Sequence, residues 1–416
     1  MISKASGIIV GGGIVGLTTA LMLHRSGFGV RVFEEAQKIK ELGVGLNLLP
    51  HSVQHLIGLG LQAKLDANAV RTSELRFFCE QGKSIWQEPR GIDAGYDVPQ
   101  YSIHRGRLQA LLKEEVIKRL GKEVLLTDRR LVNFESDQDG VIANFKSIDG
   151  SSTSERGDFL IACDGINSVV RQQLYPDQGE PHFAGLMLWR GTTVMDSFFS
   201  ERTMIMAGHS DQKIVVYPIS APDEQGKQLI NWVAEFRVPL DTIHRDDWSN
   251  AGDISEFADR FSQWQFDWLN VPEVFANAGE IYKFPMIDRD PVEQWAFGNV
   301  VLAGDAAHAM YPNGSNGASQ GILDAVGLEK QLTRHDLIAE AFTAYEQERL
   351  PPTTRLIYTN RETGPEKVLQ FVKDRCDGNC GHEHVCVPGA ELEEVANAYK
   401  KLAGFDKASL KASKRS

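Results

Sequence analysis

The sequence predicts an α/β protein in which a parallel sheet is joined to a second, β-rich region, and three observations support this prediction. A glycine-rich turn at residues 11–16 lies between an apolar run and a helical pattern. Two further apolar runs end in the dipeptides Asp164–Gly165 and Gly304–Asp305. Six of the seven tryptophans fall within residues 86–268, where strand-like patterns dominate.

The first element is a strand, turn and helix unit. The β-branched run Ile8–Val10 predicts a buried strand, and a helical pattern follows the glycines. Gly11 permits a tight turn, Gly13 lets the backbone approach a pyrophosphate, and Gly16 allows close packing of the helix on the strand. A helix N-terminus also offers free N–H groups and a positive dipole to phosphates. This unit therefore predicts a dinucleotide-binding site.

A second strand, residues 30–33, ends at Glu34. This carboxylate follows the glycines by about 20 residues, the position at which such folds bind a ribose hydroxyl. A signal peptide or membrane anchor is the competing interpretation of residues 7–23. Five glycines and two threonines interrupt that run, and it is shorter than the ~20 apolar residues of a spanning helix, so we reject this interpretation.

An amphipathic helix is predicted after residue 105, with Leu108, Leu112 and Val116 on one face. Arg105 stands at its start, where the helix dipole disfavours a cation unless an anion is close. We therefore interpret Arg105 as a phosphate ligand, with an ordinary surface arginine as the alternative. Residues 124–160 predict short strands, with hairpin turns at Asp139–Gly140 and Asp149–Gly150.

The apolar run that ends at Asp164 repeats the arrangement at Glu34, a buried strand that ends in a carboxylate. The alternative is that Asp164 only caps the next turn. A third such strand ends at Gly304–Asp305, and a glycine-rich loop then leads into a helix from Ile322. Backbone N–H groups of such a loop can converge on an anionic ligand, and a reduced flavin is an anion of this kind.

Residues 317–321 also match the hydrolase pattern G-x-S-x-G around Ser319. That pattern needs the serine on a sharp turn directly between a strand and a helix. Here the preceding strand ends far upstream, near Asp305. The sequence therefore disfavours a serine hydrolase.

Composition limits the classes of protein further. The 416 residues are enough for two or three domains. With 44 basic and 56 acidic residues, the net charge of −12 disfavours nucleic acid as a partner. No second apolar stretch approaches membrane length, so we expect no membrane association. Five cysteines, with Cys79 and Cys163 isolated, do not suggest a disulfide framework, and we expect a soluble protein of the cytoplasm.

Taken together, the three strand-end motifs resemble those of the class A FAD-dependent aromatic hydroxylases, the para-hydroxybenzoate hydroxylase family, over about residues 5–365. Segments 99–106, 189–191, 284–291 and 311–320 are most similar to the phenazine-modifying monooxygenases that act on methylphenazine carboxylate. The resemblance implies a Rossmann-like FAD-binding domain of the glutathione-reductase type, a mixed β-sheet substrate domain and a C-terminal helical segment.

The resemblance also implies a set of FAD-binding residues. These are Gly11, Gly13 and Gly16 at the pyrophosphate, Glu34 at the adenosine ribose, Arg105 at the ribityl or pyrophosphate region, Asp164 near the pyrophosphate and the nicotinamide path, Asp305 at the ribityl chain or its phosphate, and Pro312, Gly314, Gly317 and Ala318 along the isoalloxazine. No second dinucleotide fingerprint is present, which suits a family in which NADH or NADPH docks only briefly.

The activity implied is an NAD(P)H- and oxygen-dependent monooxygenase that hydroxylates an aromatic, phenazine-like or carboxylated small molecule through a flavin C4a-hydroperoxide. His308 is a candidate catalytic residue, although a structural histidine is the more ordinary interpretation. Arg190 is a second candidate, as the partner of a substrate carboxylate or as part of a salt bridge within the sheet. Tyr217 and Trp232 are candidate pocket walls, with plain core residues as the alternative.

Two alternatives stay open: an epoxidase or reductase of the same fold that acts on a quinone or isoprenoid, and an FAD-binding protein without turnover. We expect a monomer or homodimer.

The predicted FAD domain comprises residues 1–74, 100–180 and 285–360, and the predicted substrate domain comprises residues 75–99 and 181–284. Segment 361–416 is predicted to hold a helix over Leu392–Leu402 and a disordered basic tail from Lys407.

One cluster in this segment departs from the family pattern. Its members, Cys376, Cys380, His382, His384 and Cys386, do not match a standard zinc module. The sequence therefore predicts no metal site, and a metal or a disulfide at this cluster stays an open alternative.

Overall fold

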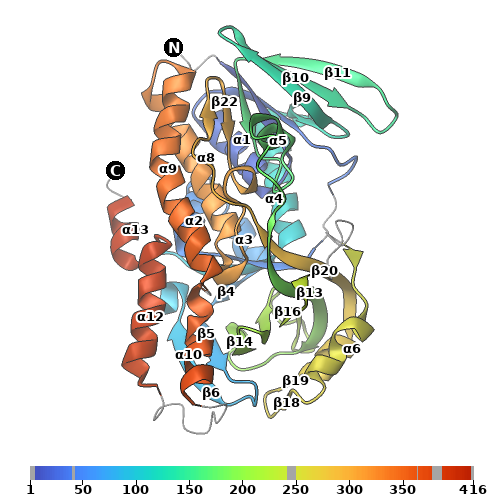
Figure 1. Cartoon of the computed structure of the whole chain (residues 1–416), viewed down its shortest axis with the longest axis vertical. Coiled ribbons are helices and arrows are strands. Elements are labelled where there is room, and N and C mark those ends of the chain that lie inside the picture. Colours follow the sequence, from blue (N-terminus) through green and yellow to red (C-terminus); the bar gives the residue numbers. More distant parts are fainter. Residues whose placement is uncertain (1–4, 40–42, 241–249, 363, 377–386, 414–416) are drawn as a thin grey trace.

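The computed structural model describes residues 5–39, 43–240, 250–362, 364–376 and 387–413. Two large sheets organise the chain (Figure 1). The first has six strands, parallel except for the pair β21–β22. In spatial order they are β21 (Ala296–Phe297), β22 (Val300–Leu302), β12 (Phe159–Ala162), β1 (Ser6–Val10), β2 (Gly29–Phe33) and β8 (Leu125–Leu126).

The register of this sheet brings the three predicted strand ends together. Val10 pairs with Ala162, and Ala162 pairs with Leu302. Because these strands are parallel, the segments that follow them emerge at the same edge of the sheet. The glycine turn, Asp164 and Asp305 therefore lie along one edge.

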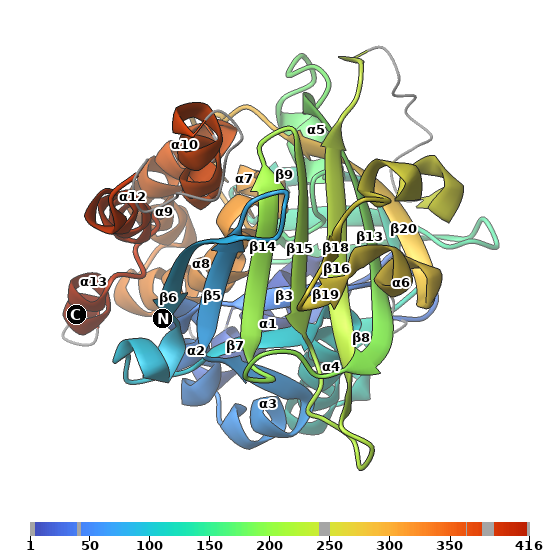
Figure 2. The ribbon, with the colours of Figure 1, turned by 90° about the horizontal axis from the view of Figure 1, so that it is seen from below.

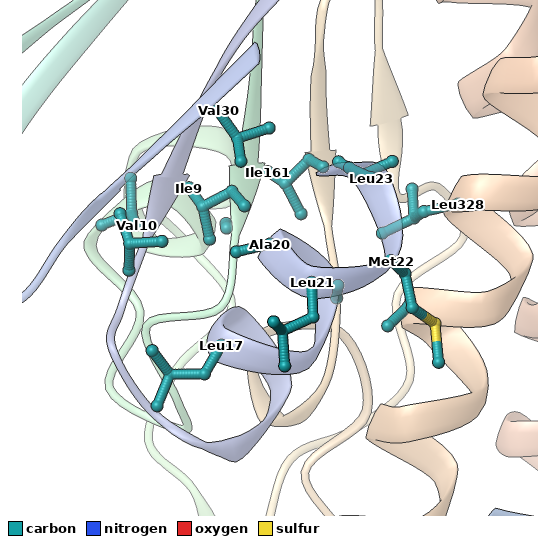
Figure 3. Close-up of a cluster of buried hydrophobic side chains, with 14 of the residues drawn as sticks. Ile9, Val10, Leu17, Ala20, Leu21, Met22, Leu23, Val30, Ile161 and Leu328 are labelled. Atoms are coloured by element: carbon teal, nitrogen blue, oxygen red, sulfur yellow. The ribbon is translucent and has the colours of Figure 1, made fainter. Parts of the chain in front are cut away.

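Helices cover this sheet and form the first core. α1 (Ile14–Arg25) packs against α4 (Arg105–Leu120) and α8 (Gly317–Arg334), while α9 (Ile338–Arg361) packs against α8. Figure 3 shows Ile9 of β1, Leu17 of α1 and Leu328 of α8 in one apolar cluster, and all three side chains are fully buried. The apolar face predicted for α4 is part of the same core.

Two three-stranded antiparallel sheets adjoin the parallel sheet. β9 (Arg130–Asp137), β10 (Gly140–Lys146) and β11 (Ser152–Gly157) form one, which confirms both predicted hairpin turns. β3 (Gly45–Leu48), β7 (Gln100–His104) and β4 (Ala69–Thr72) form the other. Helices α2 (Pro50–Gly58) and α3 (Gln62–Asn68) lie between β3 and β4 in the chain.

The second large sheet has eight strands, most of which Figure 2 shows side by side. In spatial order they are β17 (Asn250–Ala251), β20 (Ala278–Asp288), β13 (His182–Asp196), β16 (Lys227–Arg237), β15 (Gln212–Pro218), β14 (Thr203–His209), β5 (Glu74–Phe78) and β6 (Ser84–Pro89). Neighbouring strands of this sheet are antiparallel except for β14 with β5. Glu74 and the end of β20 lie outside the predicted boundaries of the substrate domain, and the division into domains stays an interpretation.

The two faces of this sheet have separate cores. One face packs against α6 (Val271–Ala276) and the short helices η6 (Ile254–Glu256) and η7 (Ala258–Phe261). The other, which we call the inner face, carries Leu188, Met206 and Tyr217 and packs against α10 (Lys367–Arg375) and α12 (Gly389–Leu402). The remaining short elements are η2 (Gly91–Ala94), η3 (Lys122–Val124), α5 (Val169–Leu174), β18 (Gln265–Phe266), β19 (Leu269–Asn270), α7 (Asp305–His308), η8 (Asn313–Ser315) and η9 (Gly364–Glu366).

The C-terminal segment is more ordered than predicted. The helix expected over Leu392–Leu402 is α12, and a further helix, α13 (Lys407–Ser413), occupies most of the tail that was predicted to be disordered. That prediction is wrong because Leu410 is buried, so the tail has an apolar contact. No helix in the described part of the chain combines the length and apolarity needed to cross a membrane.

Candidate active site

The glycine turn fits closely against the end of the neighbouring strand. Gly11 has a φ of +104°, and a Cβ added there would lie 2.3 Å from the carbonyl oxygen of Cys163. A Cβ on Gly16 would lie 2.0 Å from the carbonyl oxygen of Gly11. Both glycines are therefore required by packing at the sheet edge.

Gly13 differs, because nothing lies within 4 Å of the position that its Cβ would take. It stands at the N-cap of α1, and no side chain caps this helix. The turn therefore leaves an open space in front of a helix N-terminus, the arrangement that binds a phosphate or pyrophosphate.

Two carboxylates flank this turn. Glu34 Oε2 accepts a hydrogen bond from Gly12 N–H at 2.7 Å, and its Oε1 accepts one from Ala36 N–H at 2.8 Å. Asp164 Oδ2 accepts from Val169 N–H at 2.9 Å, but Asp164 Oδ1 is buried without a partner among the described residues. Burial raises the pKa of Asp164. A buried, unpartnered oxygen of this kind fits a hydrogen bond to a ligand group or a water.

Asp305 and the start of α8 lie beside each other. Asp305 is exposed as the first residue of α7, and a Cβ on Gly317 would lie 4.0 Å from Asp305 Oδ1. Gly317 and Ala318 open α8, which no side chain caps. Pro312 and Gly314 belong to the loop just before this helix. The site thus has a second uncapped helix N-terminus.

Arg105 is the first residue of α4, as predicted, and is exposed. Its backbone N–H donates to Val44 O at 2.9 Å, while its guanidinium makes no hydrogen bond to another described residue. Burial lowers the pKa of Arg190; Tyr217 acts against this shift, and the cation Arg105 adds to it. Arg105 therefore adds positive charge in the neighbourhood of Arg190.

Arg190 and Tyr217 lie on the inner face of the second sheet, next to β3. Arg190 Nη2 donates to Gly45 O at 2.8 Å, and Arg190 Nε is buried without a partner among the described residues. Gly45 N–H donates to Asn231 Oδ1 at 2.6 Å. Burial raises the pKa of Tyr217 to about 12, so its phenol stays protonated at neutral pH. The two sheets therefore meet through polar contacts at β3.

Trp232 does not line this site. It is fully buried on the opposite face of the sheet, where its ring contacts Phe257 and Phe275. Its register partner is Val216, the neighbour of Tyr217, so the alternation of the strand directs the two side chains to opposite faces. The prediction that Trp232 lines the substrate pocket is wrong.

His308 is also unsuited to the catalytic role considered for it. Its ring is 1% exposed, and Nε2 lies 2.6 Å from Asp324 Oδ2. Asp324 also accepts from Gly304 N–H and from Arg349. Burial tends to raise the pKa of Asp324, but His308 and Arg349 lower it to about 2. His308 therefore belongs to a buried network that holds the Gly304–Asp305 turn.

Ser319 is fully buried and donates to no catalytic base in the described part of the chain. Its hydroxyl accepts from Leu49 N–H at 3.1 Å and contacts the hydroxyl of Ser52 at 3.0 Å.

Of the cysteine and histidine cluster, Cys376 is buried at the end of α10. Cys380, His382, His384 and Cys386 lie outside the described residues.

No pattern in the sequence indicated that the C-terminal segment contacts the loop before α8. Asn316 Nδ2 donates to the Tyr399 hydroxyl at 2.8 Å, and that hydroxyl lies 3.0 Å from Asn360 Oδ1. The helical pattern of residues 392–402 predicted α12 but not what α12 covers. A Cβ on Gly314 would lie 2.2 Å from the same hydroxyl, so the loop and helix are in close contact.

Solved structures match this arrangement of a parallel sheet with a glycine turn, an adjoining inner face and a covering C-terminal segment. The structure of CtdE in complex with FAD and substrate 4 has a TM-score of 0.75 at 19% identity and covers 96% of this chain and 99% of its own. The 2,6-dihydroxypyridine-3-hydroxylase of Arthrobacter nicotinovorans has a TM-score of 0.72 at 22% identity, with 87% and 92% covered. These similarities show the fold.

The family model described as FAD binding domain matches residues 4–359, and the chain belongs to this family. The phenazine 1,6-dicarboxylic acid hydroxylase of Lysobacter antibioticus is 42% identical over 361 residues, 85% of this chain and 89% of its own. The 3-amino-4-hydroxybenzoate 2-monooxygenase of Streptomyces cremeus is 32% identical over 357 residues, 84% of each chain. The resemblance drawn from the motifs is confirmed: this is an FAD-dependent aromatic monooxygenase that uses NAD(P)H and oxygen.

Proposed function

We propose that the protein hydroxylates a carboxylated, polycyclic aromatic substrate of the phenazine type. The observation that carries this proposal is the inner face beside β3, where the cation Arg190 is in register with the apolar Val233 and lies two residues from Leu188 on the same strand. A flat apolar ring suits such a face, and a cation suits an acid group. The 42% identity to a phenazine dicarboxylic acid hydroxylase supports the same substrate class.

The residues at the sheet edge fit FAD. Gly13 and the N-terminus of α1 would receive the pyrophosphate, Gly11 and Gly16 would shape that turn, and Glu34 would bind the adenosine ribose. Arg105 and Asp164 would lie along the pyrophosphate and ribityl region. FAD, when bound, supplies reduction by NAD(P)H and the activation of oxygen.

The isoalloxazine would lie between the loop before α8 and the inner face. Asp305 would bind the ribityl chain or its phosphate, and Pro312, Gly314, Gly317 and Ala318 would line the ring. The N-terminus of α8 would stabilise negative charge on the reduced ring.

The inner face orients the substrate and keeps the reacting atoms dry. Met204, Met206 and Val215 are buried there, and water would divert activated oxygen to hydrogen peroxide. Tyr217, protonated at neutral pH, is a proposed hydrogen-bond donor to the substrate or flavin. Arg190 is a proposed contact for an anionic group. We also propose a cytoplasmic location and a monomer or homodimer without nucleic acid as a partner.

The test is oxygen uptake by the FAD-loaded enzyme with NADH or NADPH, with and without phenazine carboxylates and hydroxybenzoates. A true substrate is expected to accelerate NAD(P)H oxidation and to lower the peroxide formed per oxygen consumed. If quinones or isoprenoids do this and aromatic acids do not, the proposed substrate class is wrong. If no compound stimulates oxidation, the FAD-binding protein without turnover is favoured.

A further inference from the structure

One tyrosine of α12 connects the C-terminal segment to residues 309–316, the loop before α8, which we call the η8 loop. α12 packs beside α9 (Figure 2) and against η9. The family model matches residues 4–359, so α12 lies outside the matched part of the chain. Tyr399 of α12 is nevertheless buried, and its hydroxyl lies close to Gly314. A segment beyond the matched domain therefore contacts the loop proposed to line the isoalloxazine.

The hydroxyl of Tyr399 is the centre of a buried hydrogen-bond network. It accepts a hydrogen bond from Asn316 Nδ2 at 2.8 Å. Its own proton faces two acceptors, Asn360 Oδ1 at 3.0 Å and Asn313 O at 3.2 Å. These four residues are between 0% and 7% exposed, so no bulk water can replace a lost partner. One hydroxyl thus joins both ends of η8 to the end of α9.

The η8 loop has a backbone that needs such support. Gly314 and Ser315 have φ values of +71° and +55°, and the left-handed region is unfavourable for a serine. Strained residues of this kind persist where the surrounding contacts fix them. Asn360 supplies two such contacts, because its Nδ2 donates to Tyr311 O at 3.3 Å and its backbone oxygen accepts from Asn313 Nδ2 at 3.1 Å. The conformation of the loop therefore depends on α9 and α12.

A second chain of hydrogen bonds runs from the end of α12 to the turn at Gly304–Asp305. Gln320 Nε2 donates to Ala403 O at 3.2 Å, and Gln320 Oε1 accepts from Arg349 Nη2 at 2.7 Å. Arg349 Nε donates to Asp324 Oδ1 at 2.8 Å, and Asp324 accepts from Gly304 N–H. The C-terminal segment is thus bonded to both turns proposed to contact the flavin beyond its pyrophosphate.

We infer that Tyr399 is a positioning residue for the flavin reaction, because its hydroxyl fixes the η8 loop and the N-terminus of α8 beside the isoalloxazine. This inference rests on the proposed function, which places the ring at this loop. It gives the C-terminal segment a part in the active site, although the matched domain ends before it. Tyr399 contacts the loop and not the reacting atoms, so it acts by setting the distance between flavin and substrate.

Tyr399→Phe tests the inference, since it keeps the ring and removes only the hydroxyl. The full-length protein is freed of FAD and titrated with FAD, and the dissociation constant is expected to rise about 2- to 10-fold, the loss of a neutral hydrogen bond. The absorbance spectrum of the bound flavin is expected to change. At saturating FAD, the peroxide formed per NAD(P)H is expected to rise about threefold or more, because a small displacement misaligns the reacting atoms.

Thr193→Val is the matched control. The Thr193 hydroxyl is also buried, donates to Val274 O at 2.7 Å and accepts from Trp232 Nε1 at 3.1 Å, but it lies on the face of the second sheet away from the η8 loop. This variant loses the same kind of hydroxyl. It is expected to lower the melting temperature without changing the flavin spectrum, the FAD dissociation constant or the peroxide fraction.

Asn360→Ala removes the partner of the same hydroxyl from the α9 side, so it is expected to change the same three quantities. Residues of one network do not act independently. The double variant, Tyr399→Phe with Asn360→Ala, is therefore expected to resemble the more affected single variant. Effects that multiply in the double variant would contradict a shared network.

Tyr399 has only a structural role if Tyr399→Phe lowers the melting temperature, as Thr193→Val does, but leaves the flavin spectrum and the peroxide fraction unchanged. That result would overturn the inference. The proposed function fails separately, if no aromatic acid accelerates NAD(P)H oxidation by the unmodified enzyme. The flavin spectrum and the FAD dissociation constant need no substrate, so an unchanged value of both in Tyr399→Phe would overturn the inference in that case too.

Discussion

The three glycines of the glycine turn have different roles. Gly11 and Gly16 are required by the packing of the fold, whereas Gly13 leaves space for a ligand. A Cβ at Gly11 or Gly16 would lie within 2.3 Å or 2.0 Å of a backbone oxygen, whereas a Cβ at Gly13 would enter open space. Gly13 also has an ordinary extended backbone, with φ −74° and ψ −177°. A side chain at Gly13 would therefore occupy the space of a bound pyrophosphate and would not clash with the protein itself. A side chain at Gly11 or Gly16 would clash with the backbone.

Gly13→Val is therefore expected to abolish FAD binding while the protein stays folded, because the valine would fill the pyrophosphate space. The measurement is the flavin-to-protein absorbance ratio after purification, with thermal unfolding to check the fold. Gly29→Ala is the control, since a Cβ there would lie 4.0 Å from its nearest neighbour, Ala5 O. Stoichiometric flavin in Gly13→Val would contradict the assignment of this turn.

His308 offers a second test at the level of one side chain. His308→Ala removes one partner of Asp324, but Arg349 still donates to the same carboxylate at 2.8 Å. We expect a loss of about 1–3 kcal/mol in the free energy of unfolding and an unchanged turnover rate per bound FAD. Chemical denaturation and stopped-flow turnover measure the two quantities. A fall in turnover per flavin of a hundredfold or more would restore His308 as a catalytic residue.

Helices with a regular apolar repeat and hairpins with a turn dipeptide were predictable from the sequence. The pairing and register of strands were not. The leucines of α4 and the Asp–Gly turns of the β9–β11 sheet carry their structure locally. The face on which Trp232 lies depends on the pairing of β15 with β16, and a shift of one residue would reverse it. Nothing in the pattern of α12 specified that Tyr399 would contact Asn316.

One buried cluster links the second sheet to the C-terminal segment. Lys213 of β15 donates to Glu235 of β16 and, at 2.5 Å, to Glu366 of η9. Burial raises the pKa of Glu235 to about 7, with Lys213 and Arg237 acting against this shift and Glu366 adding to it. The folded protein therefore favours a protonated Glu235 at pH values at which the unfolded chain has released that proton.

The sign of the pH dependence follows from this raised pKa. The stabilisation is full below the ordinary glutamate pKa of 4.5 and is lost as the pH rises through about 7. Glu235→Gln imitates the protonated form. We expect the wild type and Glu235→Gln to have similar melting temperatures near pH ~5, and the wild type to be the less stable near pH ~8. A constant difference between the two proteins across this range would contradict the role of Glu235.

At the scale of the whole molecule, the candidate site is a junction between four parts of the chain. The parallel sheet supplies Asp164 and Asp305, β3 supplies Gly45, the inner face supplies Arg190, and α12 supplies Tyr399. The motifs predicted the sheet edge because each one follows its own strand. The junction with the inner face and α12 was not predictable, because it depends on contacts such as Tyr399 to Asn316, whose residues lie 83 positions apart.

The most direct measurement is product formation under isotopically labelled molecular oxygen, with phenazine-1-carboxylate and NADH or NADPH. A hydroxylase of the proposed kind inserts one atom of that oxygen into the aromatic ring, so mass spectrometry should find one labelled oxygen atom in each product molecule. NAD(P)H, oxygen and product should change in equal amounts. An unlabelled product, or NAD(P)H oxidation that yields only hydrogen peroxide with every aromatic acid tested, would contradict the account.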